Sequence, residues 1–271
     1  MHETRKKYTV LLLSAPIGSG HRLAAEALEQ AFTDRPDVEV IHGNIFDFFP
    51  QFLGKAFLGT YLWILKCCPW LYKLAYSWGN KQGGSLWLRE LLNRLLARLG
   101  GSYLRSVQPD AVIATHATPA GIIGYYKKQH PKLWLGAVVT DFTIHRWWVC
   151  DGVDTYFIAD ELLRDKLTTT ADIQATGIPV RQQFMIKHDK QKCREFFGWD
   201  ENERVCLLMG GGGVCSLSCG SAVPRRSISH CPAASSGFHT YGRPVHTLQK
   251  SVLRRVPFPG RVSDDCGYPG R

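Results

Sequence analysis

The stretch Tyr8–Pro16, with the sequence YTVLLLSAP, decides the fold of this chain. Its unbroken run of β-branched and leucine side chains is typical of a strand buried on both faces of a parallel sheet. A glycine-rich turn, IGSGH at 17–21, follows it, and apolar residues then recur at helical spacing from Leu23 to Phe32. A strand, a tight turn and a helix in this order predict the first unit of an α/β domain.

Further apolar runs bounded by turn residues predict five more strands. They are Val38–His42, Ala111–Thr115, Leu133–Thr140, Thr155–Ala159 and Ile173–Thr176. Several of them are separated by segments of helix length, which is the pattern of a parallel sheet with crossover helices. We therefore predict a doubly wound, Rossmann-like α/β domain over residues 1–182.

Residues 46–105 interrupt this alternation and predict a helical insertion that projects to one side. Its last helix, Leu86–Leu104, carries its apolar positions at Leu88, Leu91, Leu92, Leu95 and Leu99. The earlier part interleaves aromatic and basic residues, namely Trp63, Lys66, Trp70, Lys73 and Trp78. Two interpretations of that part stay open: a buried helical hairpin, or an element on a bilayer whose lysines meet anionic headgroups.

A second α/β unit begins in residues 183–213. A short helix is expected at Asp189–Phe197, and a buried strand at Arg204–Met209 runs into Gly210, Gly211, Gly212 and Gly213. Residues 214–271 then hold 6 Gly, 6 Pro and 9 Ser without any strand–helix pattern. They indicate either a natural disordered basic tail or loss of the reading frame after the glycines, and we favour the second.

Composition narrows the class of protein. With 45% hydrophobic and 21% charged residues, the 271-residue chain can bury a sizeable core. The net charge is +10, but 8 basic and 2 acidic residues place +6 of it in the last 58 residues. Nucleic-acid binding by this segment would rest on charge alone, so we do not favour it. The longest apolar run, Ala56–Leu65, is too short to span a bilayer. No secretory signal is recognised, so we expect a cytoplasmic location.

Polar residues follow several strands at the edge where open α/β sheets bind ligands. Backbone amides of Gly18, Ser19 and Gly20 at a helix start can hold a phosphate or another oxyanion, although the same turn also serves simple packing. His21 can act as a general base or as a capping, hydrogen-bonded histidine.

Two later strands add polar groups to the same edge. His116 and Thr118 follow one strand, and Asp141, His145 and Trp147 follow the next. No metal-ligand spacing accompanies these residues, so no metal site is expected and a polar, partly aromatic acceptor pocket is the better interpretation.

The chain resembles a known family in an ordered set of motifs: PIGSGHRLAA at 16–25, HATP at 116–119, VTDF at 139–142 with HRW at 145–147, and TGIPV at 176–180. They are similar to those of the monogalactosyldiacylglycerol synthase and processive diacylglycerol glucosyltransferase family. The resemblance implies a GT-B glycosyltransferase with two Rossmann-like domains. It further implies transfer of a hexose from a UDP-sugar to diacylglycerol, with no metal or other cofactor.

The resemblance favours the bilayer interpretation of the aromatic and basic residues of the insertion, and it also implies roles for other individual residues. His21 falls on the proposed acceptor-side base, Asp141 lies in the acceptor cleft, and Gly210–Gly213 match the start of the donor diphosphate loop. Residues 1–182 would be the lipid-acceptor domain, and 183–213 the linker with the first strand and glycine loop of the donor domain. Because no donor-domain pattern follows Val214, we expect this chain to be inactive alone.

Two hypotheses from different classes follow. The first is an inverting hexosyltransferase, peripheral on the inner face of the cell membrane, whose partners are a UDP-sugar, diacylglycerol and anionic membrane lipids, with no nucleic acid. The second is a non-catalytic module that binds lipid or the membrane surface.

Overall fold

A computed structural model of the chain describes residues 7–15, 19–48, 59, 60, 63, 67, 68, 70, 86–202, 204 and 205. Its centre is a six-stranded, fully parallel sheet in the order β2-β1-β3-β4-β5-β6. The strands are β1 (Tyr8–Ser14), β2 (Val38–Asn44), β3 (Ala111–Ala114), β4 (Trp134–Val138), β5 (Thr155–Ile158) and β6 (Asp172–Ala175). All six predicted strands are therefore confirmed, with small differences at their ends.

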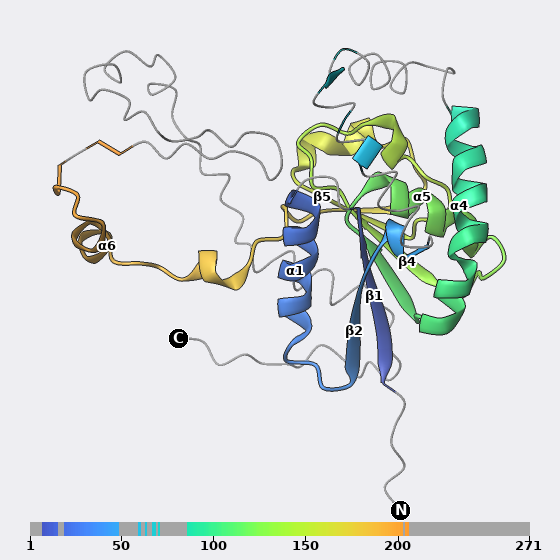
Figure 1. Cartoon of the computed structure of the whole chain (residues 1–271), viewed down its shortest axis with the longest axis horizontal. Helices are drawn as coiled ribbons and strands as arrows, with labels where there is room; N and C mark the ends of the chain where they lie inside the picture. The colour runs from blue at the N-terminus through green and yellow to red at the C-terminus, as the bar shows by residue number, and fades with distance from the viewer. Residues whose placement is uncertain are drawn as a thin grey trace, which may run out of the picture.

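Helices cover both faces of the sheet (Figure 1). They are α1 (Gly20–Phe32), α4 (Leu86–Val107) and α5 (Ala117–Lys127), with 3-10 turns η1 (Ile45–Phe48), η2 (Arg146–Trp148), η3 (Glu161–Lys166) and η4 (Gln182–Met185). Val10 and Leu12 of β1 belong to the core under α1, whereas Leu11 and Leu13 belong to the core under α4 and α5. This alternation is the period of two that a strand imposes, and it explains why β1 is apolar without interruption from Val10 to Leu13.

The order of the strands reverses next to β1. The chain leaves β1 for β2 on one side and then crosses back to β3 on the other. In an open parallel sheet, the carboxyl ends of the strands at such a reversal splay apart and leave a crevice for ligands. The loops that follow β1 and β3 are thus the first place to look for a functional site.

The helix α4 packs directly on the domain. Ala97 and Leu104 join the core, and Gly100 approaches η1 so closely that an added Cβ would lie 2.6 Å from the ring of Phe48. The leucines that mark the apolar side in the sequence behave differently: Leu91, Leu92, Leu95 and Leu99 are all exposed. The small residues let the helix come close to its neighbours, so the side rich in leucine is the outer one.

The structure describes only the start of the predicted second unit. The predicted short helix is confirmed as α6 (Lys190–Phe197), which has no buried residue and lies apart from the sheet (Figure 1). Arg204 and Val205 carry no strand assignment. The rest of the predicted strand to Met209, the glycines Gly210–Gly213 and the tail 214–271 lie outside the described residues, as does most of the stretch 49–85.

Candidate functional site

Three elements converge at the crevice between β1 and β3. His21 is the second residue of α1, His116 is the residue before α5, and Thr140 lies just beyond β4. The imidazole rings of His21 and His116 meet edge to face, with their centroids 4.6 Å apart. The structure therefore brings together groups from three separate parts of the sequence, with His21 and Thr140 lying 119 positions apart.

Hydrogen bonds define which ring nitrogen of His21 carries a hydrogen in the neutral ring. Its Nδ1 lies 2.8 Å from the carbonyl oxygen of Thr115 and 2.9 Å from Oγ1 of Thr140. A carbonyl oxygen can only accept, so Nδ1 must carry the hydrogen and donate it. In the neutral ring the lone pair then resides on Nε2. The hydroxyl of fully buried Thr115 also donates to the backbone carbonyl of His21, at 3.1 Å, which ties the start of α1 to the end of β3.

His116 has the complementary arrangement. It is the N-cap of α5, where its Nδ1 accepts a hydrogen bond of 3.1 Å from the backbone N–H of Thr118. Burial, helped by the nearby His21, lowers the pKa of His116 to about 3. The ring is therefore neutral at physiological pH, and its hydrogen resides on Nε2. His21 thus offers a ring nitrogen that accepts a proton, and His116 offers one that donates a hydrogen bond.

Asp141 joins this group through a tryptophan. The indole N–H of the buried Trp148 donates to Oδ2 of Asp141 at 3.4 Å. The centroids of the Trp148 and His116 rings lie 6.4 Å apart. Asp141 itself is exposed, directly after Thr140. The crevice therefore has a charged group at its rim and an aromatic wall beside the two histidines.

The other predicted residues of this edge have local structural contacts. His145 caps η2 by accepting at Nδ1 from the backbone N–H of Trp147, and their rings lie 6.1 Å apart. Thr118 supports His116 with its backbone, as described above. These contacts explain how the loop after β4 is shaped, and they leave the predicted ligand-binding roles of His145, Trp147 and Thr118 as predictions.

The start of α1 is open to a ligand. Ser19 is its N-cap but makes no side-chain cap, and a Cβ added at Gly20 would meet nothing within 4 Å. No acidic residue occupies the first turn, so its backbone N–H groups can donate hydrogen bonds to an anion. Gly18 of the predicted oxyanion turn, and Gly210–Gly213 of the predicted diphosphate loop, lie outside the described residues.

The predicted membrane residues are only partly described. Trp63 is 59% exposed and Trp70 is 65% exposed, while Lys66, Lys73 and Trp78 lie outside the described residues. In the part of the chain that the structure covers, no helix has the length and apolar character needed to cross a membrane.

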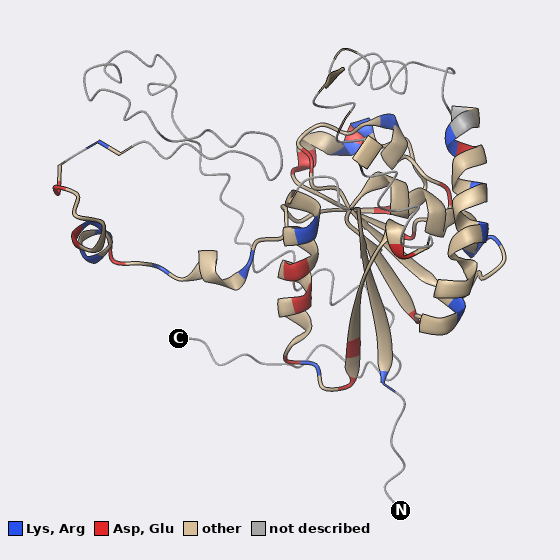
Figure 2. Ribbon diagram, viewed as in Figure 1, with Lys and Arg blue, Asp and Glu red and all other residues tan. Residues whose placement is uncertain are grey.

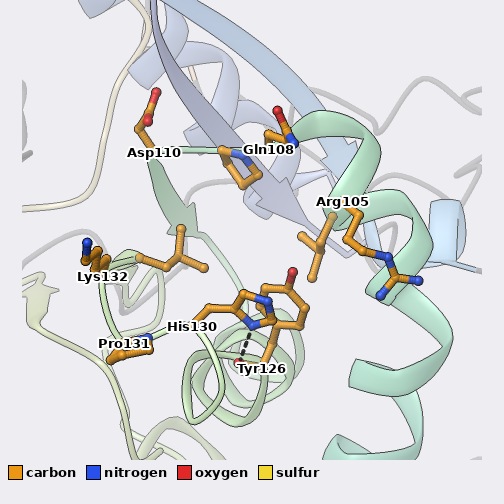
Figure 3. Close-up of a pocket in the computed structure, with 10 residues that line it drawn as sticks. Arg105, Gln108, Asp110, Tyr126, His130, Pro131 and Lys132 are labelled. Atoms are coloured by element: carbon orange, nitrogen blue, oxygen red, sulfur yellow. Dashed lines mark hydrogen bonds between the residues drawn. The ribbon is translucent and has the colours of Figure 1, made fainter.

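A cavity of about 670 Å³, whose lining residues are drawn in Figure 3, lies at the amino ends of the strands, and neither His21 nor His116 lines it. Asp110, which immediately precedes β3, and Leu133, which immediately precedes β4, line it together with the stacked rings of Tyr126 and His130. It therefore opens at the amino ends of the strands and is distinct from the candidate site. Among the described residues, no group of three or more His, Cys, Asp or Glu side chains is placed to hold a metal ion.

Sequence reasoning missed Thr115, Thr140 and Trp148 as parts of this site. Each lies next to a predicted residue, so proximity to the ends of β3 and β4 was a usable signal. Their roles depend on a carbonyl oxygen, a hydroxyl and an indole N–H, and no spacing rule singles out such groups.

Comparison with known proteins places the chain among known sequences. The sequence profile of the monogalactosyldiacylglycerol (MGDG) synthase family matches residues 21–180, which is more than half of the chain. The processive diacylglycerol β-glucosyltransferases of Bacillus pumilus (strain SAFR-032) and Bacillus cereus (strain B4264) are 28% and 29% identical to it over 218 and 214 residues. That of Bacillus subtilis (strain 168) is 26% identical over 212 residues.

These matches cover 74–77% of this chain but only 53–54% of each relative, so the chain spans about half the length of the curated relatives it matches. The matched region begins at His21 and includes His116, Thr140 and Asp141. On the strength of this match, the chain belongs to the MGDG synthase family.

Proposed function

We propose that this protein takes part in glycolipid synthesis by transferring a hexose from a UDP-sugar to diacylglycerol at the membrane surface. The observation that carries the proposal is the hydrogen bond from Nδ1 of His21 to the carbonyl of Thr115. It leaves Nε2 of a neutral imidazole as a proton acceptor at the ligand-binding edge of the sheet. The names of the relatives supply the substrate class, a diacylglycerol acceptor.

In the proposed reaction, Nε2 of His21 removes the proton of the acceptor hydroxyl while that oxygen attacks the anomeric carbon of the sugar. A C–O bond forms to the acceptor, and the bond between the anomeric carbon and the diphosphate breaks, so UDP leaves with the electron pair. The attack comes from the face opposite the leaving group, so the anomeric configuration inverts. Protonated His21 keeps its hydrogen bond to Thr115, which stabilises the imidazolium.

Neighbouring groups have supporting roles in this proposal. Neutral His116 donates from Nε2 to an oxygen of the acceptor, because its Nδ1 is engaged by the backbone N–H of Thr118. Asp141 places a negative charge at the rim, where it favours the positive charge that develops on His21. The amides of Ser19 and Gly20 at the open start of α1 hold a phosphate oxygen of the donor. The UDP-sugar is a co-substrate, and no further cofactor is required.

We further propose that the 271-residue chain transfers little sugar by itself. Its sequence after Val214 lacks any strand–helix pattern that would hold a nucleotide. The partner in the cell would be an anionic membrane surface on the cytoplasmic side, where the protein is peripheral.

A chimera tests the transferase proposal. Residues 7–180 of this chain replace the aligned residues of the Bacillus subtilis relative, which supplies the remainder of the enzyme. We expect the chimera to glucosylate diacylglycerol in mixed vesicles, and His21→Ala to lower turnover roughly a hundredfold or more, as for loss of a general base. A folded chimera whose turnover is unchanged by His21→Ala would reduce His21 to a structural residue. Binding of diacylglycerol vesicles without any transfer would favour a non-catalytic lipid-binding module.

A further inference from the structure

The outer side of α4 carries an apolar strip that the domain does not bury. Trp87, Leu91, Leu95 and Leu99 recur every fourth residue, and their exposed fractions are 63%, 54%, 51% and 44%. Residues four apart lie on one face of a helix, so these side chains form one continuous line about 18 Å long. Leu92, which is 37% exposed, widens it. We call these five residues the α4 strip.

Positive charge accompanies the strip. Arg94, Arg98 and Arg105 are all exposed, and their spacing places them in a row along one edge of the leucine line. The only acidic residue in the sequence of α4 is Glu90, whose carboxylate is ion-paired with Lys128 at 3.2 Å. Basic positions are spaced along α4 in Figure 2. The exposed side of the helix therefore combines apolar side chains with a positively charged border.

The inner side of α4 is fixed to the domain, so the strip is held on a rigid support. Asn93 is buried against Gly121 of α5, where an added Cβ would come within 2.6 Å of its amide. The Arg89 guanidinium donates to the carbonyl of Val149 at 2.8 Å and to that of Arg146 at 3.3 Å. The Trp87 end of the strip is thereby anchored to η2, the turn that contains Trp148 of the candidate site.

We infer that the α4 strip docks on the surface of an anionic bilayer, with its leucines and Trp87 in the headgroup region and its arginines on lipid phosphates. A helix with leucine and tryptophan on one side and arginine at the border is suited to lie in the interface. Arginine can bury its aliphatic stem and still keep its charge at the phosphates. The inference rests on the proposed function for its choice of partner, because it names the surface that brings the site to a lipid acceptor.

Co-sedimentation of the 271-residue chain with vesicles tests this inference. The probes are vesicles of phosphatidylcholine alone and vesicles containing 30% phosphatidylglycerol. We expect the triple variant Leu91→Ser, Leu95→Ser, Leu99→Ser to bind the anionic vesicles at least tenfold more weakly than the unaltered chain. We expect Arg94→Gln with Arg98→Gln to weaken binding to anionic vesicles by roughly tenfold, and to reduce its sensitivity to salt.

Matched controls test whether the loss of binding is specific to the α4 strip. Leu162→Ser removes a leucine that is 76% exposed elsewhere, on η3, and Lys166→Gln removes an exposed cation of the same turn. Both variants should bind like the unaltered chain. Circular dichroism and thermal melting establish that each variant folds, which is expected because every altered side chain is exposed.

Three results would overturn the inference: no binding of the unaltered chain to anionic vesicles, equal binding by the triple leucine variant, or equal loss in the Leu162→Ser control. A dimer in light scattering that the leucine substitutions convert to a monomer, without vesicle binding, would assign the strip to a protein interface instead. The transferase proposal fails separately, through the absence of product from the chimera while vesicle binding persists.

Discussion

Nδ1 of His21 donates to the carbonyl oxygen of Thr115 across 2.8 Å, although 94 residues separate the two in the sequence. The contact joins the loop after β1 to the end of β3, the two strands that flank the reversal in strand order. A second hydrogen bond joins the same two residues, because the hydroxyl of Thr115 donates to the backbone carbonyl of His21. A histidine held in this way has a fixed ring orientation and a fixed tautomer, and both favour its use as a general base.

Thr140 is expected to be a positioning residue for His21. Its Oγ1 lies 2.9 Å from Nδ1 and shares the hydrogen that Thr115 accepts. Thr140→Val keeps the shape of the side chain and removes this acceptor, which is worth about 1 kcal/mol or roughly fivefold in rate. In the chimera we expect kcat to fall by about that factor with KM for the acceptor unchanged, and Thr140→Ser to restore it.

The effect of Thr140→Val on the His21 ring can also be measured without an activity assay. Long-range ¹H–¹⁵N NMR on the 271-residue chain reports which ring nitrogen of His21 carries the hydrogen. The unaltered chain should show the Nδ1–H tautomer, and Thr140→Val should show a larger share of Nε2–H. An Nε2–H ring in the unaltered chain would contradict the assignment of Nε2 as the base.

Asp141→Asn tests the charge at the rim of the crevice. The amide keeps an oxygen that can accept from the indole of Trp148, so the loop should retain its shape, but the negative charge is lost. Because Asp141 is exposed, we expect the free energy of unfolding to change by less than about 0.5 kcal/mol. Turnover by the chimera should fall roughly tenfold if the charge supports an imidazolium at His21. Full activity of Asp141→Asn would limit Asp141 to a structural partner of Trp148.

The sequence predicts the sheet well because the strands of a parallel sheet are apolar on both faces. β1 and β3 are uninterrupted apolar runs bounded by turn residues, so their positions and their common carboxyl edge could be inferred. The convergence of His21 and His116 follows from that edge. A periodic apolar pattern, in contrast, identifies a helix without saying which side is covered.

Which side of α4 faces the domain depends on the close approach at Gly100 and on the burial of Asn93. Both are determined by the neighbouring elements. The contacts of Thr115 and Thr140 depended in the same way on where β3 and β4 end. None of these features has a signature in the local sequence, since each requires the three-dimensional neighbours to be known.

Gly124 is expected to be intolerant of any side chain. It lies in α5, and a Cβ there would be 2.1 Å from the backbone carbonyl oxygen of Asp151, so the backbone would have to move. Gly124→Ala should lower the free energy of unfolding by about 2–3 kcal/mol, measured by urea denaturation. Gly101→Ala in α4 is the matched control, because its Cβ would meet only the guanidinium of Arg105, at 3.1 Å. Replacing a helical glycine should there be neutral or stabilise by up to about 1 kcal/mol.

The neutral, partly buried His116 should make the domain less stable in mild acid. Its pKa is about 3 in the folded protein, against an ordinary value of 6.5, because burial and then the neighbouring His21 disfavour its charged form. Between these two values the unfolded chain binds a proton that the folded chain does not, so stability falls as pH falls from about 6.5 toward 3. Lowering the pH from 7 to 5 should therefore cost about 2 kcal/mol through this one group.

His116→Asn isolates this contribution. Asparagine is a good N-cap and can still accept from the backbone N–H of Thr118, so α5 should keep its first turn. Urea denaturation at pH 7 and pH 5 should show that the variant loses about 2 kcal/mol less stability than the unaltered chain over this interval. Titrating carboxyl groups affect both proteins alike, so the difference between them belongs to position 116. An equal loss in both would mean that His116 titrates in the folded domain as it does in the unfolded chain, and the assignment of a neutral His116 hydrogen-bond donor beside His21 would then be wrong.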